Sequence, residues 1–161
     1  MYLILERIDI MALFGKGNTM NMIHQDGLPG YSKGTAITMT LNESAMTLTF
    51  KARALKKPEV NLPLNRITFA GTVAVEQIET QYSLGRVVVG GVLFGAAGAI
   101  IGAMSADEKK KNEYFYIINY QKDGETKAIT MLENGGNLNY FKFQKKLTEY
   151  LPKKSESTVN L

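Results

Sequence analysis

Apolar and polar residues alternate with a period of two along most of this chain, which is the pattern of β-strands with one buried face. Between residues 36 and 50, two such runs flank the turn Asn-Glu-Ser, an arrangement typical of an antiparallel hairpin. A shorter run occupies 60–64 and a long one 67–75, and the segments 113–121 and 125–132 pair across the turn Lys-Asp-Gly. The pattern predicts a mainly β chain with about six antiparallel strands.

One amphipathic helix is predicted to follow the strands. Asn137 or Asn139 can cap it, apolar residues recur at helical spacing from Tyr140 to Leu151, and Pro152 ends it. A small sheet bent into a partly open antiparallel barrel, with this C-terminal helix capping one end, buries both patterns. The expected core of this α+β fold consists of Ile37, Met39, Met46, Leu48, Phe50, Phe69, Ile118, Ile129, Phe143 and Leu147.

The order of these elements resembles that of bacterial pleckstrin homology (PH)-like or GRAM-like domains. The resemblance rests on GLPGYSKG before the first hairpin, VNLPLNRITF, the strand EYFYIINY and the closing helix. It covers residues 27–151, interrupted by a Gly/Ala-rich apolar insert at 84–112, after an N-terminal segment at 1–26 and before a tail at 152–161 that we expect to be disordered. The resemblance implies a non-enzymatic binding scaffold, often associated with lipid or membrane.

The insert contains twenty consecutive uncharged residues, 87–106, which as one helix would span about 30 Å, the thickness of a bilayer core. If the flanking strands share one sheet, however, both ends of the insert lie on the same side. This favours a helical hairpin that turns at 95–98 and enters one leaflet. Small residues spaced four apart form a glycine zipper, whose unbroken row favours one continuous helix instead. A third alternative is an insert that packs on its own domain in water.

The residues expected to insert into the membrane and to self-associate are Gly91, Gly95, Gly98, Gly102, Val92, Leu93, Phe94, Ile100 and Ile101. Two basic clusters are expected to contact anionic headgroups, where each Lys or Arg contributes about 1 kcal/mol; the alternative is that they are solvated loops. The clusters are Arg86, Lys109, Lys110 and Lys111 beside the insert, and Lys51, Arg53, Lys56 and Lys57 between two strands. Basic residues at both ends of the insert are typical of a cytoplasmic surface.

The chain has no cysteine and one histidine, His24, which excludes thiolate catalysis, Cys-based zinc sites and His-rich metal sites. No nucleophile and base are placed together, so we expect neither an enzyme nor a cofactor. Acidic Glu6 and Asp9 argue against a signal peptide, and the net charge of +4 favours an anionic surface. No nucleic-acid-binding motif is present, and nucleic acid is not an expected partner.

These features predict a bacterial adaptor on the inner face of the cytoplasmic membrane. We expect it to bind anionic lipids through the glycine-zipper hairpin and to form a homo-oligomer or bind a protein partner. One alternative is a soluble protein-interaction module whose insert packs on its own domain or on a partner. A further alternative is a membrane-permeabilising effector that shares the insert.

Overall fold

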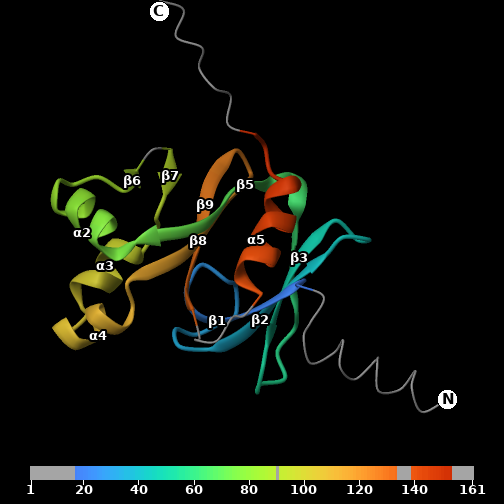
Figure 1. Cartoon of the computed structure of the whole chain (residues 1–161), viewed down its shortest axis with the longest axis horizontal. Helices are drawn as coiled ribbons and strands as arrows, with labels where there is room; N and C mark the ends of the chain where they lie inside the picture. The colour runs from blue at the N-terminus through green and yellow to red at the C-terminus, as the bar shows by residue number, and fades with distance from the viewer. Residues whose placement is uncertain (1–16, 90, 134–138, 154–161) are drawn as a thin grey trace, which may run out of the picture.

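The computed structural model describes residues 17–89, 91–133 and 139–153, and its central feature is one open antiparallel sheet of seven strands (Figure 1). The strand order is β4-β3-β2-β1-β9-β8-β5. The strands are β1 (Thr19–Asp26), β2 (Ala36–Asn42), β3 (Thr47–Ala52), β4 (Val60–Pro63), β5 (Ile67–Ala74), β8 (Tyr114–Lys122) and β9 (Glu125–Glu133). The predicted mainly β, antiparallel fold is confirmed.

Strand β1 lies N-terminal to residue 27, where we expected the domain to begin, and that boundary was wrong. It pairs with β2 on one side and with β9 on the other, so it joins the two halves of the sheet. Its side chains alternate: Met20 and Met22 are fully buried, whereas Thr19 is exposed. The strand therefore has the period-two pattern of its neighbours, in a stretch that we had assigned to the N-terminal segment.

The first hydrophobic core lies inside the curved sheet, against α5 (Tyr140–Glu149). Asn139 is the residue before the first turn of α5, and Phe143 and Leu147, one turn apart, are fully buried in this core. Of the ten predicted core residues, Met46 is wrong, because it lies exposed in the β2–β3 turn with a positive φ of 54°. Phe69 packs in a second cluster instead. The other eight predicted core residues are confirmed: Ile37, Met39, Leu48, Phe50, Ile118, Ile129, Phe143 and Leu147.

Phe69 lies on the other face of the sheet because the register of β5 shifts by one residue between Ile67 and Phe69. An extra residue in a strand reverses which side chains point inward beyond it. Ile67 and Ala70 therefore reach the first core, whereas Phe69 and Val73 pack in a second cluster on the outer face.

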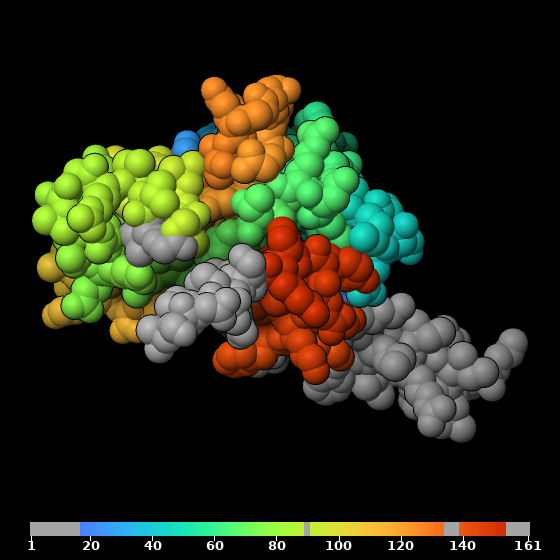
Figure 2. Space-filling model, turned by 90° about the horizontal axis from the view of Figure 1, so that it is seen from above, coloured from blue at the N-terminus to red at the C-terminus, as the bar shows by residue number. Residues whose placement is uncertain are grey.

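The chain between β5 and β8 covers this outer face of the sheet, on the side away from α5 (Figure 1). The strand was expected to run to residue 75, but a helix begins there, because Val75 and Ile78, three residues apart, bury one helical face. In Figure 2 the same segment, coloured green to gold, forms a lobe beside the red α5. Its elements are α2 (Val75–Ser83), β6 (Val88–Val89), β7 (Val92–Leu93), α3 (Ala97–Gly102) and α4 (Ala106–Lys111), and the 3-10 helix η1 (Leu64–Arg66) precedes β5.

Candidate functional site

The apolar insert packs on its own domain. Phe94, Ala97 and Ile101 are buried in the second cluster, against Phe115 and Ile117 of β8. A short β6–β7 hairpin followed by two six-residue helices replaces both the predicted helical hairpin and the continuous helix, which were wrong. The physical reason is that the outer face of β8 is apolar as well as its inner face, so it needs a cover that the insert supplies.

The glycines of the predicted zipper do not share one helical face. Gly91 and Gly95 have positive φ angles of 82° and 53°, which no α-helix contains. A Cβ on Gly98 would lie 2.3 Å from the Tyr82 ring of α2, so this glycine permits close packing within the chain, whereas Gly102 has open space around it. Val92, Leu93 and Ile100 are half-buried. The G-x-x-x-G row is therefore interrupted by a turn, and its tightest contact is intramolecular.

Asn119 of β8 fixes the insert to the sheet. Its side chain is buried and forms two hydrogen bonds with one backbone residue: the Leu93 N–H donates to Oδ1 at 2.9 Å, and Nδ2 donates to the Leu93 carbonyl at 2.6 Å. The amide thus satisfies both backbone groups of Leu93, as a neighbouring strand would. An Asn among apolar residues in a predicted strand was the only sequence signal for this contact.

The basic cluster beside the insert is partly occupied by contacts within the lobe. Lys109 forms an ion pair with Glu79 of α2 at 2.6 Å, and Arg86 donates to the Gln81 side chain at 3.3 Å. Lys110 and Lys111 lie exposed in the last turn of α4, where cations interact favourably with the helix dipole. Ser105 and Glu108 form a capping box at the start of α4, and the Ser-x-x-Glu signature of this motif is present in the sequence.

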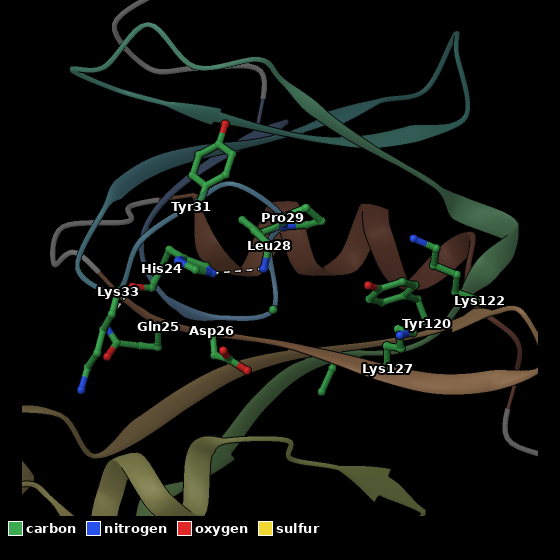
Figure 3. Close-up of a pocket in the computed structure, with 12 residues that line it drawn as sticks. His24, Gln25, Asp26, Leu28, Pro29, Tyr31, Lys33, Tyr120, Lys122 and Lys127 are labelled. Atoms are coloured by element: carbon green, nitrogen blue, oxygen red, sulfur yellow. Dashed lines mark hydrogen bonds between the residues drawn. The ribbon is translucent and has the colours of Figure 1, made fainter.

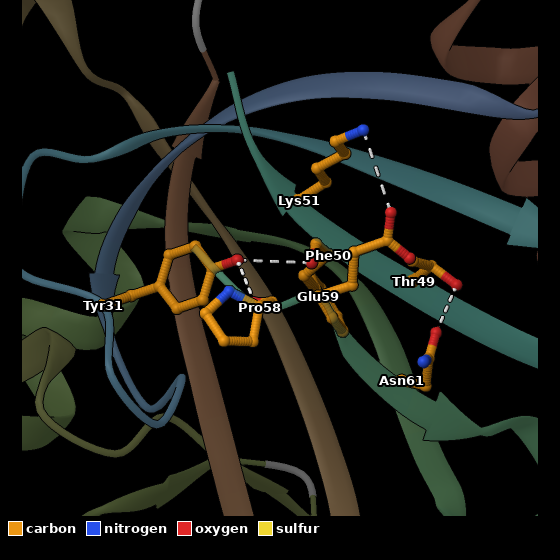
Figure 4. Close-up of polar contacts among 7 residues, drawn as sticks. All are labelled: Tyr31, Thr49, Phe50, Lys51, Pro58, Glu59 and Asn61. Atoms are coloured by element: carbon orange, nitrogen blue, oxygen red, sulfur yellow. Dashed lines mark hydrogen bonds and ion pairs between the residues drawn. The ribbon is translucent and has the colours of Figure 1, made fainter. Parts of the chain in front are cut away.

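The second basic cluster surrounds an exposed leucine. In the loop between β3 and β4, Leu55 is 55% exposed, and Arg53 and Lys56 beside it are exposed and form no ion pair with any described residue. Lys51, at the end of β3, faces Glu59 at 3.9 Å, so its charge is partly neutralised (Figure 4). The free charge of this cluster is therefore concentrated around Leu55.

A brace from a distant loop supports this basic loop. The Tyr31 hydroxyl donates to the Pro58 carbonyl at 3.0 Å and lies 3.4 Å from the Phe50 carbonyl (Figure 4). Lys57 Nζ donates to the Gly30 carbonyl at 2.7 Å and lies 5.6 Å from the Tyr31 ring centroid, within the range of a cation–π contact. The loops 27–35 and 53–59 consequently form one end of the sheet, which we call the basic end.

A polar hollow of about 560 Å³ adjoins the basic end. Figure 3 shows it between the 27–33 loop, with Lys33, and the strands that bear Tyr120, Lys122 and Lys127. None of the three lysines forms an ion pair with another described residue, and Asp26 is the one carboxylate in the lining. Three lysines against one aspartate make the hollow attractive to an anion.

The ring of His24 forms hydrogen bonds with two backbone groups of the 27–35 loop. Its ring is buried, Nδ1 lies 2.9 Å from the Ser32 carbonyl, and the Leu28 N–H donates to Nε2 at 3.1 Å. Because a backbone N–H only donates, Nε2 is an acceptor and the proton resides on Nδ1, where it is donated to Ser32. His24 therefore acts as a neutral structural residue whose two nitrogens are both used.

Across the described ranges, no group of three or more His, Cys, Asp or Glu side chains is arranged to hold a metal ion. Within the same ranges, no helix has both the length and the apolar character needed to cross a bilayer. Comparison with known proteins gives no match to a family model, to a curated protein or to a solved structure.

Proposed function

We propose that this chain is a non-enzymatic, PH-like binding module that docks reversibly on an anionic membrane surface through its basic end. The open antiparallel sheet and the packing of α5 in the first core agree with the architecture that the resemblance implies. The observation that carries the proposal is Leu55, an exposed apolar residue at the tip of a loop between Arg53 and Lys56. An apolar tip with basic neighbours suits an interface where hydrocarbon adjoins negative headgroups.

The expected contributions to the binding free energy favour a peripheral and reversible attachment. Arg53, Lys56 and Lys57 near an anionic leaflet contribute about 1 kcal/mol each, and burial of one leucine side chain adds about 1.5–3 kcal/mol. The hollow beside the loop provides room for a negatively charged headgroup, with Lys122 and Lys127 on its wall. The insert is not needed for this docking, since its buried residues Phe94, Ala97 and Ile101 already pack on the sheet.

The test compares two double charge reversals in the full chain, with vesicles of phosphatidylcholine containing phosphatidylglycerol. Arg53→Glu with Lys56→Glu should reduce cosedimentation by at least about tenfold, because four units of charge change at the docking surface. Lys110→Glu with Lys111→Glu changes the charge equally on the lobe and should reduce binding much less. If the reversal at Lys110 and Lys111 reduced binding more than the reversal at Arg53 and Lys56, docking would occur through the lobe and the proposal would be refuted.

A single substitution then separates the apolar contribution from the charge. Leu55→Ser should weaken binding to the same vesicles without altering how steeply binding falls with salt, because no charge is removed. Equal binding of this variant and the wild-type protein would show that the loop tip does not enter the membrane.

The second candidate is a protein-interaction module, and four exposed apolar residues on the lobe favour it. Leu84 is 62% exposed, and Tyr82, Val87 and Val88 are each 44% or more exposed. Exposed apolar side chains are the kind that protein partners cover when they form one patch. Absence of vesicle binding together with loss of a captured partner in a Leu84→Ser variant would favour this candidate over the first.

A further inference from the structure

His24 is a titratable side chain whose ring forms hydrogen bonds with the backbone of Leu28 and Ser32 in the 27–35 loop. We infer that protonation of His24 displaces Leu28 and loosens residues 28–31, so that acid weakens docking of the basic end on an anionic membrane. This inference rests on the function proposed above and adds a regulation of the same site.

The argument starts from the two nitrogens of the ring. The neutral ring accepts from the Leu28 N–H and donates to the Ser32 carbonyl, so both contacts require one donor and one acceptor. A protonated ring has two donors, and Nε2–H then faces the Leu28 N–H across 3.1 Å. Two donors cannot share that space, so the imidazolium and residue 28 must separate.

The rest of the loop does not depend on the charge of the ring. The His24 backbone binds Thr35 and Gly34 through two hydrogen bonds, at 2.8 and 2.7 Å, and neither involves the imidazole. Ser32 also stays in place, because its carbonyl accepts from the Thr35 N–H and hydroxyl, and the protonated ring still donates to it. The change is therefore confined to residues 28–31. Gly30 and Tyr31, which brace Lys57 and Pro58, lie within that stretch.

The surroundings of His24 contain groups of both signs (Figure 3). The strand β2 that pairs with β1 contributes no ionisable side chain, because it reads AITMTLN. The titratable side chains around the ring and the hollow come from β1, the 27–35 loop, β8 and β9: Asp26, Tyr31, Lys33, Tyr120, Lys122 and Lys127. Protonation of His24 adds a positive charge, and acidification to about pH 5.5 also protonates a small fraction of the surface carboxylates. Both changes make the protein more cationic, which by itself strengthens binding to anionic lipid. A decrease in binding on acidification therefore cannot come from net charge.

The experiment measures vesicle binding and the state of the ring together. Phosphatidylglycerol vesicles are titrated into the full chain at about pH 7.5 and about pH 5.5 at constant ionic strength, and we expect binding at least about threefold weaker at the lower pH. His24→Gln retains an uncharged side chain with an acceptor and a donor, and its binding should not fall on acidification. In the wild-type protein the single histidine gives one imidazole signal in nitrogen-resolved NMR, and the Leu28 amide should shift with the same midpoint as that signal.

The outcomes separate the inference from the proposed function. Wild-type binding that is equal or stronger at about pH 5.5 overturns the inference and leaves the membrane function standing. An imidazole that titrates without movement of the Leu28 amide also overturns it, and this result needs no variant. Absence of vesicle binding at both pH values, with the amides shifting as expected, refutes the membrane function itself.

Discussion

The side chain of Asn119 binds both backbone groups of Leu93, at 2.9 and 2.6 Å, and thereby joins the apolar insert to the middle of the sheet. Phe115 and Ile117, on the same face of β8, pack against the insert through apolar contacts. This polar contact gives the insert one defined register, because apolar surfaces alone tolerate sliding whereas two hydrogen bonds do not. The apolar stretch that suggested a membrane segment is thus an integral part of the domain.

Asn119→Ala should lower the free energy of unfolding by about 2–4 kcal/mol, because two backbone groups of Leu93 lose their partners. Denaturant unfolding measures this loss, and proteolysis should cleave the insert first. Asn65→Ala, at an exposed position in η1, is the matched control and should change stability by less than about 0.5 kcal/mol. Equal stability of the two variants would contradict the conclusion that Asn119 fixes the insert to the sheet.

Gly98→Ala and Gly102→Ala should have opposite effects, although both glycines belong to α3. A Cβ at Gly98 would lie 2.3 Å from the Tyr82 ring, so we expect a loss of about 1–3 kcal/mol. Gly102 has no atom within 4 Å of such a Cβ, and alanine there should stabilise the helix by up to about 1 kcal/mol. Thermal unfolding distinguishes these results from those of an intermolecular zipper, in which both substitutions would reduce association and leave the monomer intact.

Deletion of residues 87–106 should destabilise the domain. Removal of the segment uncovers Phe115, Ile117 and Leu132, and exposure of each large apolar side chain costs about 1.5–3 kcal/mol. We expect aggregation in size-exclusion chromatography and increased binding of a hydrophobic dye. Ala99→Ser with Ala103→Ser, at two exposed positions of the same segment, should leave the protein monodisperse. A soluble, cooperatively folded deletion variant would show that the second cluster is dispensable.

Stability should fall steeply in alkali because of Tyr116. Burial raises the pKa of its hydroxyl far above the usual value near 10, with Tyr140 adding to the shift. Above about pH 10 the unfolded chain releases this proton and the folded chain retains it, so stability is present below that pH and declines by about 1.4 kcal/mol per pH unit above it. Denaturant unfolding between about pH 8 and 11 measures the slope.

Tyr116→Phe should flatten this alkaline decline. The variant also loses the hydrogen bond from the hydroxyl to Gln144 Oε1, at 2.7 Å, and should be about 1 kcal/mol less stable at neutral pH. Tyr114→Phe, two residues earlier and exposed, is the matched control and should retain the wild-type slope. Identical slopes for all three proteins would remove Tyr116 as the origin of the effect.

Part of the candidate site is visible in the sequence. The charges of Arg53, Lys56 and Lys57 are adjacent in the chain, and their clustering marks the loop without any structure. The hydrogen bond between Tyr31 and Pro58 is not visible in the sequence. These residues are separated by 27 positions and meet only because their loops converge at one end of the sheet. Leu55 gains its significance only from its exposure, since in the sequence it is one apolar residue among many.

Six strands and the closing helix of this protein follow from its sequence, because they depend on local periods of two and 3.6 residues and on turn and cap residues within a few positions. The six are β2, β3, β4, β5, β8 and β9. Which face each residue occupies was decided by the tertiary structure. The one-residue register shift before Phe69 moved that side chain from the inner to the outer face. The placement of the uncharged insert was also decided by the tertiary structure, because a membrane and a protein interior are equally apolar surroundings for it. Only the second apolar face of β8 and the amide of Asn119 determine that the insert packs on the sheet.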